Sequence, residues 1–445
     1  MDTPHVSRRH FLAGSLAAGV LGLSGCAPGA PGGGGDASAT TLQFWHLLSG
    51  GDGITMQGLI DEINQQHPEF FVRPTVLAWG APYYTKLAMA GAGGRAPELA
   101  VMHSSRVPGY VPGGLLDPWD TELLAELGVE ESTFTEPIWQ SSLVDGQLYS
   151  VALDAHPFIA LYNRDICEQA GVLDSDGALL RPDNPEDFFE MCREIAGVTG
   201  HHGLSYGFLA DGTQMWRLFY TLYSQHGAQM NFPQGGTAEF DVDAFTASLE
   251  FMHTLADGEI AARQGTIDFA IAEFAAQQSG IHFTGVWELP TMQNAGVPVD
   301  ATMIPPVFGQ EAVYADSHSL VLPHQMEPDE QARRLSYTFV AELLKNSLTW
   351  AGAGHIPAYL PVVEDPDYAE LIPQAHYAEA ADHIVYDPTA WFTGSGSNFV
   401  QDFGSIVGDA VVSGSGYEEA AQRFQNHVDS ILASPNPANP EEGGA

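Results

Sequence analysis

The fold is decided by the stretch Gly146–Gly171, which reads GQLYSVALDAHPFIALYNRDICEQAG. A glycine turn at its start runs into a strand, and polar Asp154 and His156 come before the apolar run Phe158–Tyr162. The residues Asp165–Ala170 then favour a helix, which ends at a glycine. The stretch therefore predicts a strand followed by a helix, which is the repeating unit of an α/β protein.

The sequence on both sides of this stretch shows the same alternation of strand and helix. Met56, Leu59, Ile60 and Ile63 recur at helical spacing between two apolar runs. The strands expected upstream are Thr41–Leu47, Phe70–Leu77 and Glu98–Met102, with helices at Met56–His67 and Tyr84–Ala92. Downstream we expect a strand at Ile281–Val286 and helices at Pro185–Ala196, Met215–His226, Asp243–Asp257, Ala270–Ser279, Asp329–Asn346 and Tyr417–Ala433. This order predicts an α/β fold with parallel strands.

The first 40 residues have the pattern of an export signal and a tether. Two arginines, Arg8 and Arg9, precede an apolar run, Phe11–Leu23, that is too short to span a membrane. The sequence Leu-Ser-Gly-Cys that ends at Cys26 resembles the lipobox of bacterial lipoproteins. We therefore expect a twin-arginine lipoprotein signal peptide over residues 1–25, lipidation of Cys26, and a flexible Gly- and Pro-rich tether over residues 26–40.

Composition sets the size and the class of partner. A chain of 445 residues with 44% apolar residues is globular but too long for one core, which predicts two lobes. The formal net charge is −41, and Lys86 and Lys345 are the only lysines. Such a charge argues against binding to nucleic acid or to anionic lipid heads, because both are repelled. We expect a solvated acidic surface, as in organisms that live at high salt.

Two cysteines remain after Cys26 is assigned to the lipid. Cys167 and Cys192 lie in separate helical segments of an exported chain, so they could be joined by a disulfide or remain free. They do not have the spacing of a zinc site, and His201 and His202 lack a third ligand nearby. No metal and no cofactor is expected.

The mature chain resembles the bacterial extracellular solute-binding proteins of family 1, the maltose-binding type. The resemblance is strongest at Gly146–Gly171, where family members have a strand, a hinge with a polar residue, and then Tyr-Asn before a helix. Weaker matches follow in the same order as in the family. They are Gly93–Met102, Gly280–Pro290, Asp316–Pro323 and Gly352–Pro357.

The resemblance implies a two-lobe, periplasmic-binding-protein-like fold of type II with ligand held between the lobes. The N-lobe is expected to comprise residues 41–153 and 305–352, and the C-lobe residues 154–304 and 353–445. Crossings between lobes are expected near Leu153–His156, Met303–Phe308 and Gly352–Pro357. The implied protein is a monomeric binder, not an enzyme, that delivers a sugar to the permease of an ABC importer. It would contact the outer face of the membrane through its lipid alone.

A sugar site needs aromatic faces to stack on and polar groups to meet hydroxyls. The candidates stand where predicted strands end or in later loops. They are Trp45, His46, Tyr83, His103, Ser104, Ser105, Arg106, Asp154, His156, Trp216, Trp287, Glu288, His318, His355 and Trp391. The resemblance assigns a polar hinge contact to His156, hydroxyl binding to the loop Ser104–Arg106, and ring stacking to Trp287.

Two other classes of function stay open. A polyol or glycerophosphoryl solute is one, although the predicted cleft offers mainly Arg106 for a phosphate. A secreted glycoside hydrolase is the other, because paired carboxylates cannot be located from sequence. The motif G-x-S-x-G at Gly203–Gly207 lacks the strand before it and the helix after it that a nucleophile elbow requires.

Overall fold

The computed structural model describes residues 39–437. The signal peptide, the lipidated Cys26 and nearly all of the tether predicted above lie outside the described residues. Within residues 39–437, no helix combines the length and the apolar character needed to cross a bilayer.

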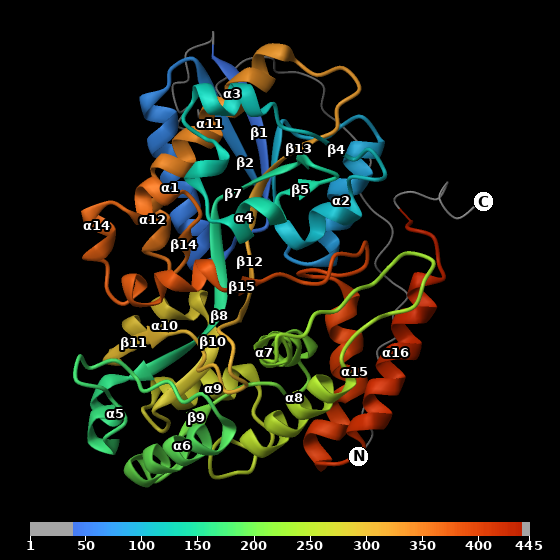
Figure 1. Ribbon diagram of the computed structural model, residues 1–445. Helices are drawn as coiled ribbons and strands as arrows, with labels where there is room; N and C mark the ends of the chain where they lie inside the picture. Colours follow the sequence, from blue (N-terminus) through green and yellow to red (C-terminus); the bar gives the residue numbers. More distant parts are fainter. Residues whose placement is uncertain (1–38, 438–445) are drawn as a thin grey trace, which may run out of the picture. The chain divides into compact units, whose positions relative to one another are not determined.

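The first lobe is built on a sheet with strand order β2-β1-β3-β13-β4, and β7 pairs with β13. β1 is parallel to β2 and β3, whereas β13 runs antiparallel to β3. The strands are β1 (Thr40–His46), β2 (Phe70–Val76), β3 (Leu99–His103), β4 (Leu116–Asp117), β7 (Ser150–Ala152) and β13 (His318–Pro323). The helices beside them in Figure 1 include α1 (Gly50–Gln66), α2 (Ala81–Ala92), α3 (Thr121–Glu126), α4 (Glu136–Ser141), α11 (Glu330–Lys345) and α12 (Ser347–Ala351).

Helix α1 shows why the sequence folds this way. Its Met56, Leu59, Ile60 and Ile63 are all fully buried, and they lie on one face because they recur every three or four residues. The helix packs against β2, α11 and α12. The predicted strand and helix bounds in this part of the chain agree with the structure to within three residues, except that α1 begins at Gly50, six residues before the predicted start at Met56.

The second lobe is built on a sheet with order β15-β12-β8-β10-β9, and β11 and β14 also pair with β8. The strands are β8 (Asp154–Asn163), β9 (Leu204–Ser205), β10 (Ile281–Gly285), β11 (Val299–Thr302), β12 (Val313–Asp316), β14 (Ile356–Pro357) and β15 (Ile384–Val385). The helices around them are α5 (Arg164–Ala170), α6 (Pro185–Thr199), α7 (Gly212–Gln225), α8 (Val242–Leu255), α9 (Ile267–Ala275), α10 (Leu289–Asn294), α15 (Asn398–Ser413) and α16 (Tyr417–Leu432).

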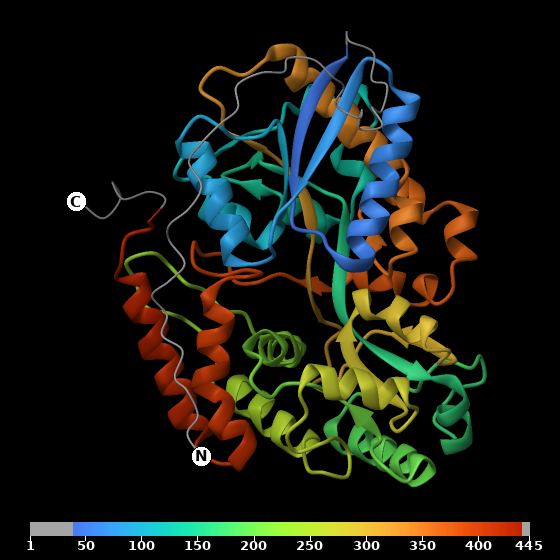
Figure 2. The ribbon, with the colours of Figure 1, turned by 180° about the vertical axis from the view of Figure 1, so that it is seen from behind.

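Three segments pass between the two sheets (Figures 1 and 2). The first is Leu153, because β7 belongs to the first sheet and β8 to the second. The second is Ser317, between β12 and β13. The third runs from α12, which packs on α1, to β14, which pairs with β8.

The second crossing lies later in the chain than the sequence predicts. We expected it at Met303–Phe308, but β12 at Val313–Asp316 still pairs with β8 and β15 in the second sheet. The stretch 305–316, which was assigned to the N-lobe, therefore lies with the second lobe. The turn-rich sequence between Pro305 and Ala312 looks like a connection, yet the chain stays in the second lobe for one more strand before it crosses.

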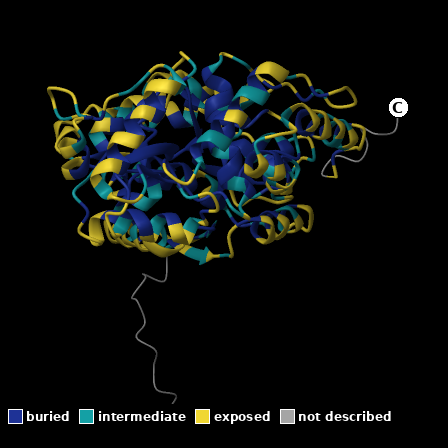
Figure 3. Cartoon of the chain, turned by 90° about the horizontal axis from the view of Figure 1, so that it is seen from below, coloured by how far each residue is buried: buried dark blue, intermediate teal, exposed yellow. Residues whose placement is uncertain are grey.

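Burial follows the two sheets. Dark blue is concentrated in the interior of Figure 3, and yellow lies mainly on the outer faces of the helices. One apolar cluster surrounds the first sheet and continues past the crossings to Val286 and Leu289. A second cluster, rich in aromatic rings such as Trp216, Phe403 and Phe424, fills the second lobe.

The two remaining cysteines are buried free thiols. Cys167 lies on α5 and Cys192 on α6, and these helices pack against each other. The disulfide that the sequence left open is thus not formed in the structure. Burial raises the pKa of both thiols, so they stay protonated at neutral pH.

Candidate solute-binding site

A cavity of about 240 Å³ lies where the crossing segments meet. Its wall combines side chains from both lobes and from all three crossings. The lining residues are Leu47, Leu48, Ser49, Asp52, Trp79, His103, His156, Arg217, Trp287, His318 and His355. Leu47 follows β1 and His103 ends β3, so this wall is formed at the carboxyl ends of parallel strands, where ligands of open α/β sheets bind.

The second lobe contributes an aromatic face and a positive charge. Trp287 lies in a 3-10 turn, Val286–Glu288, directly after β10. The guanidinium of Arg217 lies 4.5 Å from the centroid of the Trp287 ring, a cation–π distance. The first lobe adds Trp79, which is 49% exposed and stands just before α2. One tryptophan from each lobe therefore borders the cavity.

Arg217 reaches the cavity because of its place on α7. The Asp211 side chain caps this helix by accepting hydrogen bonds from the backbone N–H groups of Thr213 and Gln214. Consecutive residues of a helix point about 100° apart. Trp216 accordingly points into the core, where it is fully buried, while Arg217 lines the cavity.

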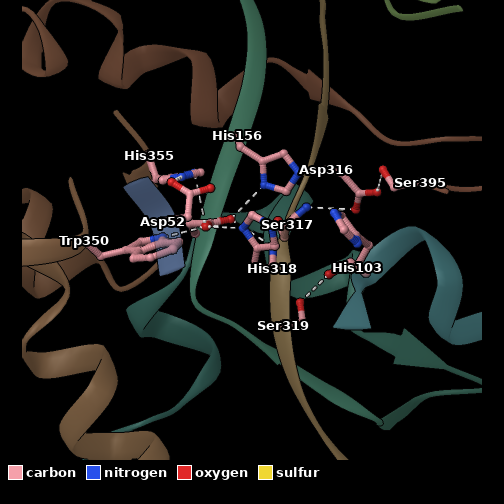
Figure 4. Close-up of polar contacts among 12 residues, drawn as sticks. Asp52, His103, His156, Asp316, Ser317, His318, Ser319, Trp350, His355 and Ser395 are labelled. Atoms are coloured by element: carbon pink, nitrogen blue, oxygen red, sulfur yellow. Dashed lines mark hydrogen bonds and ion pairs between the residues drawn. The ribbon is translucent and has the colours of Figure 1, made fainter. Parts of the chain in front are cut away.

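Asp154, at the start of β8, is the polar centre of a cluster beneath the cavity, and its partners His156, His318 and Trp350 are labelled in Figure 4. Its carboxylate is completely buried and lies 3.0 Å from His156 Nδ1 and 2.8 Å from His318 Nδ1. It accepts hydrogen bonds from the Trp350 indole N–H at 2.6 Å and from the His318 backbone N–H at 2.9 Å. These partners compensate the cost of burying the charge.

The charges in this cluster influence one another. Burial alone would raise the pKa of Asp154, but the charges of His318, His355 and His156 outweigh burial and lower it well below its usual range. Burial tends to lower the pKa of His318, yet the neighbouring Asp154 raises it overall. Burial lowers the pKa of His103 far below its usual value. The cavity floor therefore carries a carboxylate that stays ionised and imidazoles whose pKa values are shifted in opposite directions.

A second carboxylate approaches from the first lobe. Asp52, in the first turn of α1, lies 3.1 Å from His355 Nε2. The other ring nitrogen of His355, Nδ1, lies 3.4 Å from Asp154 Oδ2 and has no hydrogen-bond partner among the described residues. His355 is fully buried, so this nitrogen is also shielded from water.

A network around Asp316 ties the lobes together beside the cavity. The hydroxyl of Ser105, which follows β3, donates to the Asp316 carboxylate, and the Ser395 hydroxyl donates to it at 2.7 Å. The Ser395 backbone N–H donates to Ser105 Oγ at 3.1 Å. Arg106 donates to the Thr393 carbonyl at 2.8 Å. The loop after β3 is therefore fastened to the segment 393–395 and to the second crossing.

The structure brings some of the predicted site residues together. His103, His156, Trp287, His318 and His355 line the cavity, and Asp154 lies beneath it. Ser105 and Arg106 belong to the network around Asp316 and are not among the residues of the cavity wall. Ser104 is buried and its hydroxyl lies 2.6 Å from that of Ser319.

The structure places the other predicted residues elsewhere. Three are in the core: Tyr83 donates to the Val101 carbonyl at 2.6 Å, Trp216 donates to Asp387 at 2.6 Å, and His46 is 1% exposed. Trp45 lies on the outer side of β1 under the Lys86 ammonium, 5.2 Å from its ring centroid. Glu288, next to Trp287, is absent from the cavity wall.

Trp391 borders a separate groove of about 770 Å³ together with Arg106 and residues of α2. Its indole N–H donates to Gln234 at 2.9 Å.

Sequence reasoning missed six residues of the cavity wall and one of its supports. The six include Leu47, Leu48 and Ser49. Asp52, Trp79 and Arg217 line the cavity, and Trp350, which reads as an ordinary core tryptophan, is a hydrogen-bond donor to Asp154. Asp52 and Trp79 stand in or beside turns after predicted strands, a signal that could have found them. Arg217 and Trp350 carry no such signal.

Two lobes joined by three crossings, with a cavity at the junction, define a protein of the two-lobe binding class. Residues 59–373 match the family model described as bacterial extracellular solute-binding protein, so the chain belongs to that family.

Solved structures support the fold. The sugar-binding protein MalE from the phytopathogen Xanthomonas citri has a TM-score of 0.72 at 17% identity, covering 88% of this chain and 98% of that one. The GacH receptor of Streptomyces glaucescens, solved unliganded and with acarbose, has a TM-score of 0.71 at 18% identity, with the same coverage of 88% and 98%.

A curated relative gives a weaker match over part of the chain. The sn-glycerol-3-phosphate-binding periplasmic protein UgpB of Yersinia enterocolitica is 24% identical over 220 residues, which are 48% of this chain and 46% of that protein. The chain thus spans about half the length of the curated relatives it matches.

Proposed function

We propose that this protein captures a carbohydrate, a mono- or oligosaccharide, and delivers it to the permease of an ABC importer. The observation that carries the proposal is one cavity between the lobes that combines the Trp287 ring with a rim of hydrogen-bonding groups. In this structure the Arg217 guanidinium lies over the Trp287 ring, so a stacked sugar would take the place of the guanidinium there. Sugars present apolar faces ringed by hydroxyls, so this combination suits them. The similarity to the sugar-binding protein of Xanthomonas citri supports the same class of solute.

The dimensions favour a small solute or the end of a longer one. A cavity of about 240 Å³ is below the range of roughly 300–1,000 Å³ that is usual for drug-sized ligands. Asp52 would accept hydrogen bonds from sugar hydroxyls, and Arg217 would donate hydrogen bonds to sugar oxygens. A neutral His103 imidazole can do either, depending on its tautomer. Trp79 stands at the rim, where a further sugar residue would meet its exposed face.

Because the cavity wall comes from both lobes, solute contacts would favour the closed arrangement over an open one. A ligand shifts such an equilibrium only by its differential affinity for the two states. A closed, loaded form is what a permease would need to recognise. Export by the twin-arginine route and anchoring through Cys26 are parts of this proposal that depend on the sequence alone. The expected result is that the full-length chain incorporates labelled lipid in a bacterial host and that Cys26→Ser does not.

The direct test is a melting-temperature screen of the purified chain over a library of sugars and polyols. A bound solute raises the melting temperature by mass action. Each hit is then measured by calorimetry, and the recovered sugar is analysed by mass spectrometry. We expect at least one sugar to stabilise the protein and to be recovered intact. Hydrolysis of the sugar would refute the binding proposal and favour the alternative, a glycoside hydrolase.

The aromatic role is tested with Trp287→Ala. Loss of the stacking face should weaken binding of the sugar found in the screen by at least tenfold, about 1.4 kcal/mol. Trp45→Ala is the matched control, since it removes a half-buried tryptophan that lies outside the cavity. Equal affinity of the Trp287→Ala variant and the parent chain would refute the stacking role.

A glycerophosphoryl solute is the second candidate, favoured by the match to UgpB and by Arg217 in the cavity wall. Arg106, which the sequence suggested for a phosphate, is instead bound to Thr393. One arginine is few for a phosphate, so we rank this candidate below a sugar. Including sn-glycerol-3-phosphate in the screen decides between the two classes of solute. Binding of sn-glycerol-3-phosphate that is abolished by Arg217→Gln would support the glycerophosphoryl solute.

A further inference from the structure

We propose that Asp154, His156, His318 and His355 form a binding site for one divalent transition-metal cation of the zinc class, at the floor of the cavity. One possible ligand atom from each of the four lies within 4.8 Å of the others, and all four residues are buried. The sequence predicts no metal, because these residues come from three distant segments that only the crossings bring together. The inference goes beyond solute capture and does not depend on which solute binds.

The kind of ligand selects the cation. Imidazole nitrogens suit zinc, copper, nickel and cobalt, whereas calcium and magnesium prefer six or more oxygens. Three imidazoles and one carboxylate are a ligand set that zinc accepts with four-coordinate, tetrahedral geometry. The cluster offers one oxygen-bearing group against three nitrogen-bearing ones, so it favours a transition metal over calcium or magnesium.

The distances are close to those that a metal would need. Ligand atoms about 2.0–2.1 Å from a tetrahedral zinc ion lie roughly 3.3 Å from one another. The Asp154 oxygens lie 3.0 Å from His156 Nδ1, 2.8 Å from His318 Nδ1 and 3.4 Å from His355 Nδ1. Small inward shifts of the three rings would therefore place one cation among them, with the Nδ1 protons of His156 and His318 released to solvent.

His355 gives an independent reason to expect a ligand. Its Nδ1 is buried, faces the Asp154 carboxylate and has no hydrogen-bond partner among the described residues. Its Nε2 lies 3.1 Å from Asp52. If the neutral His355 ring donates a hydrogen bond from its Nε2–H to Asp52, its Nδ1 lone pair points at the Asp154 carboxylate. This contact is unfavourable, and a cation between the two groups would replace it with two coordination bonds.

The outer partners are those that metal ligands usually have. A histidine that binds metal through one ring nitrogen typically donates a hydrogen bond from its other ring N–H to a carboxylate. His355 is placed to do so with Asp52. The Trp350 indole N–H donates a hydrogen bond to the Asp154 carboxylate at 2.6 Å. Both supports are already in place around the cluster, so little rearrangement is needed beyond the ligands themselves.

The test uses the mature chain without a histidine tag, treated with EDTA and dialysed, in the absence of any sugar. Zn²⁺ is titrated by calorimetry, and Co²⁺ is titrated while its visible absorption is recorded. We expect one equivalent of each to bind and Co²⁺ to give the intense visible bands of a four-coordinate site. Zn²⁺ should also raise the melting temperature, and EDTA should reverse the rise.

Variants locate the site. His355→Gln and His318→Gln should each weaken Zn²⁺ binding at least 100-fold and remove the visible Co²⁺ bands, and Asp52→Asn should weaken it about 10-fold. His427→Gln on α16, a partly exposed histidine far from the cluster in the sequence, is the matched control and should bind as the parent chain does. A cooperative melt in EDTA confirms that each variant is folded, and His156→Gln replaces any variant that is not.

Binding of zinc that is unchanged in folded His355→Gln and His318→Gln, or no stoichiometric binding by the parent chain, would overturn the proposal. Because no sugar is present, these results are separate from those of the sugar screen. If the protein binds a sugar but not zinc, only the metal-site proposal is refuted. If it binds zinc but no sugar, only the carbohydrate proposal is refuted.

Discussion

At the residue scale, one buried carboxyl outside the cavity makes stability depend on pH. Asp387 is fully surrounded by protein, and burial, followed by the charge of Asp316, raises its pKa from 3.8 to about 7. Its oxygens accept hydrogen bonds from the Trp216 indole N–H at 2.6 Å and from the Tyr314 hydroxyl at 3.0 Å. The folded state thus holds a proton on Asp387 at pH values where the unfolded chain has lost it.

The sign of the effect follows from this difference. Between about pH 4 and pH 7 the folded state binds more protons than the unfolded one, so this group's contribution to stability falls as pH rises and levels off above pH 7. Asp387→Asn keeps the shape and cannot ionise. Relative to the parent chain, we expect it to gain about 2 kcal/mol of unfolding free energy between pH 5.5 and pH 8. Denaturant titrations at both pH values measure this gain, and a difference between the two chains that does not change with pH would contradict the assignment.

Single residues were the hardest part of the site to predict from sequence. His103 was found because it stands at the end of a predicted strand, whereas His318 was predicted in a loop and begins β13 in the structure. Trp216 was misplaced because a helix start tells nothing of which neighbour points inward, and Arg217, one position later, is the residue in the cavity. The cluster around Asp154 depends on crossings between distant segments, which no local pattern reports.

At the scale of elements, the end of β10 controls where the stacking ring lies. Gly285 is the last residue of this strand, and a Cβ at that position would stand 2.0–2.2 Å from three atoms of the Trp287 ring. The ring therefore rests against the glycine backbone. A methyl group there must displace the indole, because a contact below about 3 Å is far inside van der Waals distance.

Gly285→Ala should accordingly weaken solute binding by about as much as Trp287→Ala, tenfold or more, through a changed ring position. Displacement of a partly exposed ring into the cavity should cost roughly 1–3 kcal/mol of stability. Calorimetry with the sugar from the screen and tryptophan fluorescence of the free protein measure the two effects. Gly197→Ala on α6 is the matched control, because its φ, like that of Gly285, is not positive and a Cβ there meets nothing within 4 Å. Normal solute affinity in Gly285→Ala would show that the ring is not fixed by this strand end.

Periodicity served best for elements with one buried face. The buried stripe of α1 and the apolar strands β1 to β3 follow directly from side-chain spacing. The predicted bounds of these strands agree with the structure to within one residue, whereas α1 begins six residues earlier than predicted because its first turns are rich in glycine. Short strands were harder to predict, because a few residues are too few to show a clear pattern. β12 has four residues and is fully buried, and it was overlooked because it directly follows a turn-rich stretch, which is why the second crossing was placed too early.

At the scale of the whole molecule, the charge of the chain is the property that sequence reports completely. There are 56 acidic residues against 15 lysines and arginines, so most carboxylates have no basic partner. Several of the cations that do exist are already in ion pairs, such as Arg333 with Asp117 and Lys345 with Glu342. The excess negative charge repels itself, and unfolding relieves the repulsion by spreading the charges apart.

Salt should therefore stabilise this protein more than it does a neutral one. The screening length falls from about 10 Å at 0.1 M to about 3 Å at 1 M, which removes most repulsion between exposed carboxylates. We expect the melting temperature at pH 7.5 to rise by about 5 °C between 0.1 and 1 M NaCl, a shift that corresponds to roughly 4 kcal/mol for a cooperative unit of this size. KCl and choline chloride should give similar rises if screening is the cause, whereas a rise confined to NaCl would indicate specific sodium binding. EDTA is kept in every sample so that a metal at the Asp154 cluster does not contribute. A melting temperature that stays constant or falls with salt in all three series would mean that self-repulsion does not limit the stability of this fold, and that its acidic surface has some other role.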